Sequence, residues 1–304
     1  MRPTFANTLY DLAKRDKGVY LLTSDVGYSV FERFIDDLPK QYVNVGIAEA
    51  NMIGISAGLA SSGKKVFAYS MSHFLTLRCY EQIKLDLCYP KLNVKLIGSG
   101  GGLTYGSQGP THQSNEDISI MRSLPNMCVI CPGDPIETGY AVREALKRGG
   151  PVYIRLSKKD PIVHASDDID FRIGKGIILN NGSDLTLIST GNMLATAKEV
   201  CERFQADGKK VCLVSMHTIK PLDIRLVKEL AETGRPMFSL EEHSLVGGLG
   251  GAISEVLAEL DCKVPFRRIA LPDGFCNVIG SQTHLRRSYG LDPDSVYRTI
   301  RDIL

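Results

Sequence analysis

Short apolar runs alternate with amphipathic stretches along the first half of the chain. The amphipathic stretches predict helices at 5–15, 49–61, 74–88 and 135–148. The apolar runs predict strands, and several are apolar at successive positions, which is typical of parallel strands covered on both faces. These strands are expected at 19–23, 42–45, 65–69, 93–98, 127–131 and 151–156. Alternation of this kind favours an α/β domain with right-handed crossovers.

A second alternation follows after a polar, turn-rich stretch at 158–183. Its predicted strands are 185–189, 210–215, 236–240 and 266–271, and its predicted helices are 192–206, 222–232, 248–260 and 293–303. The fold class is therefore α/β, as two consecutive domains with mostly parallel sheets. We expect a first domain at 1–160, a linker at 161–184 and a second domain at 185–304.

Composition and charge exclude several classes of protein. The 304 residues carry a net charge of +2, and the pairs Arg267-Arg268 and Arg286-Arg287 form no extended basic stripe, so nucleic-acid binding is not expected. No apolar run approaches the roughly 20 residues of a membrane helix, so no membrane association is expected either. The N-terminal residues lack the apolar core of a signal peptide, and we expect a cytoplasmic protein with reduced thiols.

Two patterns invite a cofactor or metal interpretation that their spacing does not support. Cys128 and Cys131 form the single C-x-x-C among eight cysteines, but no second pair exists for a zinc ribbon. The pair lies in a predicted buried strand, where residues three apart point to opposite faces, so a structural role is favoured over a redox one. The glycine-rich stretches 98–102 and 247–251 do not fit G-x-G-x-x-G, which disfavours nicotinamide binding.

Two segments carry the candidate chemistry. Glu49 opens a predicted helix of small residues, where a carboxylate is favoured by the helix dipole and where another chain can approach closely. His112 lies in a Gly- and Pro-containing loop, 105–113, just after the carboxyl end of a predicted strand, where α/β sheets bind ligands. His112 is a candidate acid–base or hydrogen-bonding group. When each residue is considered alone, Glu49 can also be a surface charge at a helix start, and His112 can also be a packing residue.

The combination is more specific than either segment. The order of Glu49, an aromatic segment at 73–82 and Gly-Pro-Thr-His-Gln at 109–113 resembles the transketolase group of thiamine-diphosphate enzymes. The resemblance continues through 122–126, 131–134 and Glu137, and through Glu-Glu-His-Ser-Leu-Val-Gly-Gly-Leu-Gly-Gly at 241–251 in the second domain. It covers nearly the whole chain in the same order. The chain thus resembles a pyrimidine-binding domain followed by a transketolase C-terminal domain.

The resemblance assigns roles at the pyrimidine end of thiamine diphosphate. It implies that Glu49 bonds the aminopyrimidine ring and favours the tautomer that deprotonates the thiazolium. It also implies that Phe74 stacks on that ring, although core packing is an alternative for Phe74. Arg78 and Asp25 match further cofactor-site positions, while a turn or cap role remains open for Asp25.

The resemblance leaves the diphosphate end without residues in this chain. The group holds that end through a divalent metal and a G-D-G…N motif, and this chain has no Gly-Asp-Gly. Mg²⁺ or Ca²⁺ requires oxygen ligands, so no metal site is expected here. The chain therefore resembles the C-terminal subunit of a split transketolase. We expect an N-terminal partner subunit with the missing motif, in a heterotetramer of two of each chain.

The expected substrate class is sugars or sugar phosphates, with transfer of a two-carbon ketol unit. The resemblance implies substrate contacts for Gln108, His112 and Lys158, and Arg2 is a further candidate for a phosphate contact. For Lys158 and Arg2, a solvated surface charge is the alternative. Ser107 and Gln108 replace an acidic pair, and Gly100 stands at the place of a histidine. These departures predict an altered substrate. Alternatives are a 2-oxo acid dehydrogenase E1 β subunit, a deoxyxylulose-phosphate synthase fragment and a non-catalytic partner subunit.

Overall fold

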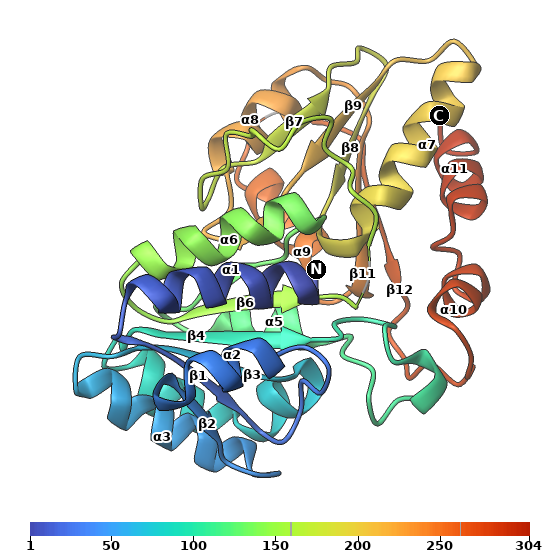
Figure 1. Cartoon of the computed structure of the whole chain (residues 1–304). Helices are drawn as coiled ribbons and strands as arrows, with labels where there is room; N and C mark the ends of the chain where they lie inside the picture. Colours follow the sequence, from blue (N-terminus) through green and yellow to red (C-terminus); the bar gives the residue numbers. More distant parts are fainter. Residues whose placement is uncertain (159, 262) are drawn as a thin grey trace.

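A seven-stranded sheet forms the centre of the first half of the chain (Figure 1). The computed structural model describes residues 1–158, 160–261 and 263–304. The strand order is β10-β5-β6-β4-β3-β1-β2, with all strands parallel except the edge strand β10. Their bounds are β1 (Val19–Thr23), β2 (Tyr42–Asn44), β3 (Lys65–Met71), β4 (Val94–Ser99), β5 (Cys128–Ile130), β6 (Val152–Leu156) and β10 (Thr218–Lys220).

Helices cover both faces of this sheet, which explains the continuous apolar runs. One face packs against α1 (Arg2–Arg15), α2 (Glu32–Asp37) and α6 (Pro135–Lys147). The other packs against α3 (Glu49–Ser61), the helical segment 74–88 and α5 (Asp117–Ser123). Segment 74–88 contains the short α4 (Tyr80–Gln82) between two π-helical stretches, Phe74–Arg78 and Ile83–Cys88. Single π-helical turns are often found at functional sites.

A five-stranded sheet forms the centre of the second half, in the order β12-β11-β8-β9-β7. Only β7 is antiparallel to its neighbour. The strands of this five-stranded sheet are β7 (Ile177–Asn180), β8 (Leu185–Ser189), β9 (Val211–Ser215), β11 (Met237–Ser244) and β12 (Phe266–Leu271). The helices are α7 (Leu194–Ala206), α8 (Ile224–Glu232), α9 (Leu249–Ala258), α10 (Gln282–Ser288) and α11 (Pro293–Arg301). Two α/β domains with mostly parallel sheets are confirmed.

The two halves are joined by more than a linker. One apolar cluster runs from the α3 face of the first sheet to β9, α8 and α9 of the second half. β10 lies within the second half of the sequence but pairs with β5 of the first sheet. β7 lies in the segment expected to be a linker, because its residues alternate between half-buried and exposed at the sheet edge and give no apolar run. β11 extends to Ser244, four residues beyond the predicted strand end.

None of the helices in the described parts of the chain has the length and apolar character that a membrane crossing requires.

Candidate active site

Glu49 lies at the first turn of α3 with its side chain buried. Its Oε2 accepts a hydrogen bond from Arg78 Nη1 at 2.6 Å, while the Arg78 side chain is half exposed. Its Oε1 makes only long contacts, 3.4 Å to the Ser24 hydroxyl and 3.5 Å to the Ser70 hydroxyl. These two hydroxyls bond each other at 2.7 Å. The site therefore presents a buried carboxylate with one firmly held oxygen and one oxygen that keeps capacity to bond.

Arg78 connects this carboxylate to aromatic rings from two distant segments. Phe74 begins the π-helical stretch after β3, and the Arg78 guanidinium lies 4.9 Å from the centre of its ring. His112 meets Phe74 edge to face, with 5.3 Å between ring centroids. Arg78 thus contacts both Glu49 and Phe74, and Phe74 contacts His112. The structure brings these four predicted residues into one cluster.

His112 is half buried and held within its own loop. Its backbone N–H donates to the carbonyl of Gly109 at 3.0 Å, and its Nδ1 lies 2.9 Å from the Thr111 hydroxyl. Gly109 has a φ of +75°, a conformation that glycine adopts at little cost. The loop geometry thus fixes the backbone beneath the imidazole and gives its Nδ1 a neighbouring hydroxyl.

The other predicted site residues are exposed. Asp25 is exposed after β1, and its carboxylate accepts a hydrogen bond from Asn44 Nδ2 at 3.1 Å. Its neighbour Ser24, which the sequence did not single out, is the residue that contacts Glu49. Gln108 is exposed in the loop that carries His112, and Lys158 is exposed just beyond β6. Asp25, Gln108 and Lys158 follow β1, β4 and β6, and ligands of α/β sheets bind at the carboxyl ends of parallel strands.

The wall of the cluster contains buried polar atoms without a partner. Gln113 is 2% exposed, yet neither end of its amide has a hydrogen-bond partner among the described residues. The Nδ1 of His73 is also buried without a partner there. Burial lowers the pKa of His73 below its ordinary value. Unpaired buried polar groups cost free energy, which a bound water or a ligand can offset.

Gly100 is covered by the ring of Tyr105. A Cβ added at Gly100 would overlap Tyr105 Cε2, and Gly100 has a φ of +82°. Any side chain at this position would therefore displace Tyr105 and strain the backbone. The ring of Tyr105 thus occupies the space that a side chain at position 100 would take.

The C-x-x-C pair is part of the core. Cys128 packs into the apolar cluster on one face of the first sheet, and Cys131 into the cluster on the other. Burial raises the pKa of Cys128 to about 11 and that of Cys131 further still. Both thiols are therefore in their unreactive, protonated form at neutral pH.

Comparison with known proteins agrees with this geometry. The family model of the transketolase pyrimidine binding domain matches residues 1–161, and that of the transketolase C-terminal domain matches 174–296. This chain belongs to the transketolase family. A putative transketolase C-terminal section from Methanocaldococcus jannaschii is 39% identical over 99% of this chain and 95% of its own length. One of the subunits of the apulose-4-phosphate transketolase of Phocaeicola vulgatus is 38% identical over 98% of this chain and 95% of its own length.

One solved structure has the same fold as this chain over nearly its whole length. It is a split-gene transketolase in an inactive β4 tetramer, with a TM-score of 0.90 and 36% identity, covering 99% of this chain and 97% of that one. The resemblance to a C-terminal subunit of a split transketolase is thereby confirmed. The chain has a transferase role as part of a split enzyme.

Proposed function

We propose that this chain supplies the aminopyrimidine side of a thiamine diphosphate site in a two-chain transketolase. The observation that carries the proposal is the buried Glu49 carboxylate, held by Arg78 next to the Phe74 and His112 rings. In this proposal a second chain with the G-D-G…N motif holds the diphosphate and Mg²⁺ or Ca²⁺. Two copies of each chain form the active heterotetramer.

The residues present fit an aminopyrimidine. Such a ring offers nitrogen donors and acceptors together with an aromatic face. Glu49 Oε1 retains bonding capacity, and the unpaired amide of Gln113 and Nδ1 of His73 offer further polar partners. Phe74 is half buried and presents an aromatic ring next to them. An apolar face flanked by a few convergent polar groups is the usual composition of a small-molecule site.

Each residue then has a physical task. Thiamine diphosphate, when bound, supplies the carbon nucleophile of ketol transfer. Glu49 shares a proton with the pyrimidine ring, and its burial keeps water away from that hydrogen bond. Phe74 orients the ring, and Arg78 holds the second oxygen of Glu49 in place. His112 is positioned to donate or accept a proton at the substrate's reacting oxygen, and Asp25 completes the rim.

Assignment of the metal to the partner is supported by this chain's own residues. No group of three His, Cys, Asp or Glu side chains in the described ranges is placed to hold a metal ion. The full sequence also lacks Gly-Asp-Gly. The relative from Phocaeicola vulgatus is one subunit of its transketolase rather than a complete enzyme, which supports a two-chain organisation.

The proposed substrates are sugars or sugar phosphates, with Gln108 and Lys158 as contacts at the rim. Lys158 could hold a phosphate as a point charge. The Gly100–Tyr105 packing favours a substrate different from the common pentose phosphates, because the histidine position is closed by Tyr105. A donor and acceptor screen on the complex tests this point. Best efficiency on xylulose 5-phosphate with ribose 5-phosphate would overturn the altered specificity.

Replacement of Glu49 tests the catalytic role. In the two-chain complex, Glu49→Gln should lower kcat at least about hundredfold, because the amide cannot share the proton. Glu144→Gln is the matched control, since Glu144 lies on α6 in a surface pair with Lys147, and it should retain activity. Unchanged activity of Glu49→Gln in an intact complex would favour a non-catalytic subunit. Decarboxylation of a 2-oxo acid with transfer to a lipoyl group would favour the E1 β alternative, which the transketolase relatives support less.

A further inference from the structure

The loop that carries His112 is closed at its base. We call residues 103–113 the His112 loop. Gly102 and Ser114 form an antiparallel bridge beneath it, with Gly102 N–H to Ser114 O at 2.8 Å and Ser114 N–H to Gly102 O at 3.1 Å. Compact loops whose ends lie close together are packed by their own side chains. The position of the base therefore contributes to where the imidazole lies.

The base is held by a carboxylate from the second domain. Glu242 on β11 has a fully buried side chain. Its Oε1 accepts from the backbone N–H of Leu103 at 2.8 Å, from Gln282 Nε2 at 2.8 Å and from Asn192 Nδ2 at 3.1 Å. Its Oε2 pairs with the Arg286 guanidinium. Charge-assisted hydrogen bonds of this kind are stronger than neutral ones, so Leu103 is firmly held.

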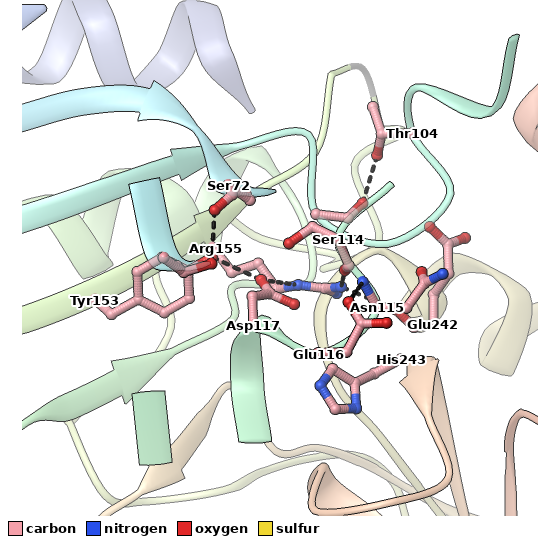
Figure 2. A network of polar contacts seen from close by, with 12 residues as sticks. Ser72, Thr104, Ser114, Asn115, Glu116, Asp117, Tyr153, Arg155, Glu242 and His243 are labelled. Atoms are coloured by element: carbon pink, nitrogen blue, oxygen red, sulfur yellow. Dashed lines mark hydrogen bonds and ion pairs between the residues drawn. The ribbon is translucent and has the colours of Figure 1, made fainter. Parts of the chain in front are cut away.

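The other end of the base is held by Arg155 of β6 in the first sheet and by the backbone of β11. Arg155, at 5% exposure, donates to the carbonyls of Ser114 and Glu242, each at 2.9 Å, and pairs with Asp117 Oδ2 at 2.8 Å (Figure 2). The N–H of Ser244 donates to the carbonyl of Asn115 at 2.8 Å. Strand β11 thus holds both the first residue of the His112 loop and the residues just after it.

Packing reinforces the same attachment. Leu103 is fully buried in the apolar core of the second domain, although it belongs to the first. Gly102 has a φ of +64°, and an added Cβ would lie 2.5 Å from Glu242 Oε1. Within the loop, a Cβ at Gly106 would lie 2.8 Å from the carbonyl oxygen of Gly280 and from Leu285 Cδ2. The first part of the His112 loop therefore packs directly on the second domain.

We infer that Glu242 is a positioning residue, through which the second domain sets the place of His112 relative to Phe74. His112 contacts the reaction in the proposed function, on which this inference rests, and Glu242 acts only through the loop base. The second domain thereby acquires a role in catalysis besides assembly. Loss of the Glu242 carboxylate frees Leu103 and loosens the His112 loop, without touching Glu49 or Arg78.

Hydrogen–deuterium exchange on the full chain tests this attachment independently of activity. Glu242→Gln keeps the shape of the side chain. The carboxylate offers two oxygens to its hydrogen-bond donors, whereas the amide offers only one. Exchange in 103–113 should increase about tenfold or more, as expected for loss of a buried charge-assisted bond. Exchange in α7 should stay as in the unchanged chain, which separates local loosening from global unfolding.

The neighbouring buried carboxylate provides the matched control. Glu241 accepts from the N–H groups of Leu249 and Gly250 at 2.7 and 2.8 Å and caps α9 without contacting the His112 loop. Glu241→Gln should loosen α9 and leave 103–113 unchanged. Gln282→Ala, which removes a half-buried link to Glu242 and Thr104, should give a smaller increase in the same loop. Two results would overturn the inference. One is unchanged exchange of 103–113 in both Glu242→Gln and Gln282→Ala. The other is an increase in exchange of 103–113 in Glu241→Gln as large as that in Glu242→Gln.

Activity supplies a second readout in the two-chain complex. Glu242→Gln should lower kcat about tenfold or more with a smaller change in the Kd for thiamine diphosphate, because Glu49, Phe74 and Arg78 lie outside the loop and only Gln113 lies within it. A change in Kd with kcat unchanged would contradict a positioning role. If the unsubstituted complex is inactive, the proposed function fails, whereas the exchange result still decides whether Glu242 holds the loop.

Discussion

The His112 and Phe74 rings meet edge to face with 5.3 Å between their centroids. His112 follows β4 and Phe74 follows β3, two adjacent parallel strands whose carboxyl ends share one edge of the sheet. Arg78 extends this contact to the buried Glu49 at the start of α3. Because the rings are in contact, changes at one affect the environment of the other.

Removal of the Phe74 ring should weaken cofactor binding. Phe74→Ala in the two-chain complex is expected to raise the Kd for thiamine diphosphate about tenfold or more, since an aromatic contact and its buried area are both lost. Titration of the cofactor against activity measures this. The matched control is Tyr297→Ala, which removes a half-buried ring that packs on Phe204 in the second domain. An equal effect of the two substitutions would show that Phe74 acts through stability alone.

The buried Arg155–Asp117 pair should be a large contributor to folding. Burial would lower the pKa of Arg155, but the adjacent Asp117 charge outweighs burial and raises it. Asp117→Asn leaves the guanidinium without a counter-charge and should lower the free energy of unfolding by about 3–5 kcal/mol, measured by urea denaturation. The exposed pair Arg172–Asp170 provides the comparison, and Asp170→Asn should cause no measurable change. A small effect of Asp117→Asn would mean that backbone carbonyls suffice for Arg155.

The buried Glu137–His164 pair should make stability depend on pH. Burial alone would lower the pKa of His164, but its 2.8 Å contact with Glu137 outweighs burial and raises it above 6.5. The protonated histidine therefore stabilises the folded chain fully below pH 6.5, and this contribution is lost as the pH rises through the folded pKa. Glutamine at 164 cannot become charged. The difference in unfolding free energy between the unchanged chain and His164→Gln should be largest below pH 6.5 and shrink at higher pH.

Urea denaturation between pH 5.5 and 9 measures that difference. The pKa of His217 is lowered by burial and also by the charge of His164, so the comparison measures His164 together with its effect on His217. His284→Gln, which changes an exposed histidine on α10, should follow the unchanged chain across this range. A difference that stays constant with pH would show that His164 is neutral in the folded state.

The pattern of apolar residues in the sequence predicts the buried strands and the amphipathic helices of the fold. The helix starting at Glu49 and ending at Ser61 and the buried parallel strands were expected, because strands covered on both faces are apolar throughout. β7 and β10 were not predicted. β10 is three residues long, and β7 is a half-exposed edge strand, so neither leaves an apolar run. Their pairing depends on long-range packing.

The candidate site was predicted to a similar extent. Motif order indicated Glu49, Phe74, Arg78 and His112, and the structure places them together. Ser24 was missed because a single serine beside Asp25 has no distinctive spacing. The attachment of the His112 loop by Glu242 joins residues 139 apart in the chain, and local sequence contains no signal for it.

Reconstitution tests the central claim most directly. The purified chain is titrated with its cognate N-terminal subunit in the presence of thiamine diphosphate and Mg²⁺, and ketol transfer to a panel of sugar and sugar-phosphate acceptors is measured. The account predicts no turnover by either chain alone and activity that rises to a plateau at equal amounts of the two. Turnover by this chain alone, with the cofactor and metal but without the partner, would contradict it.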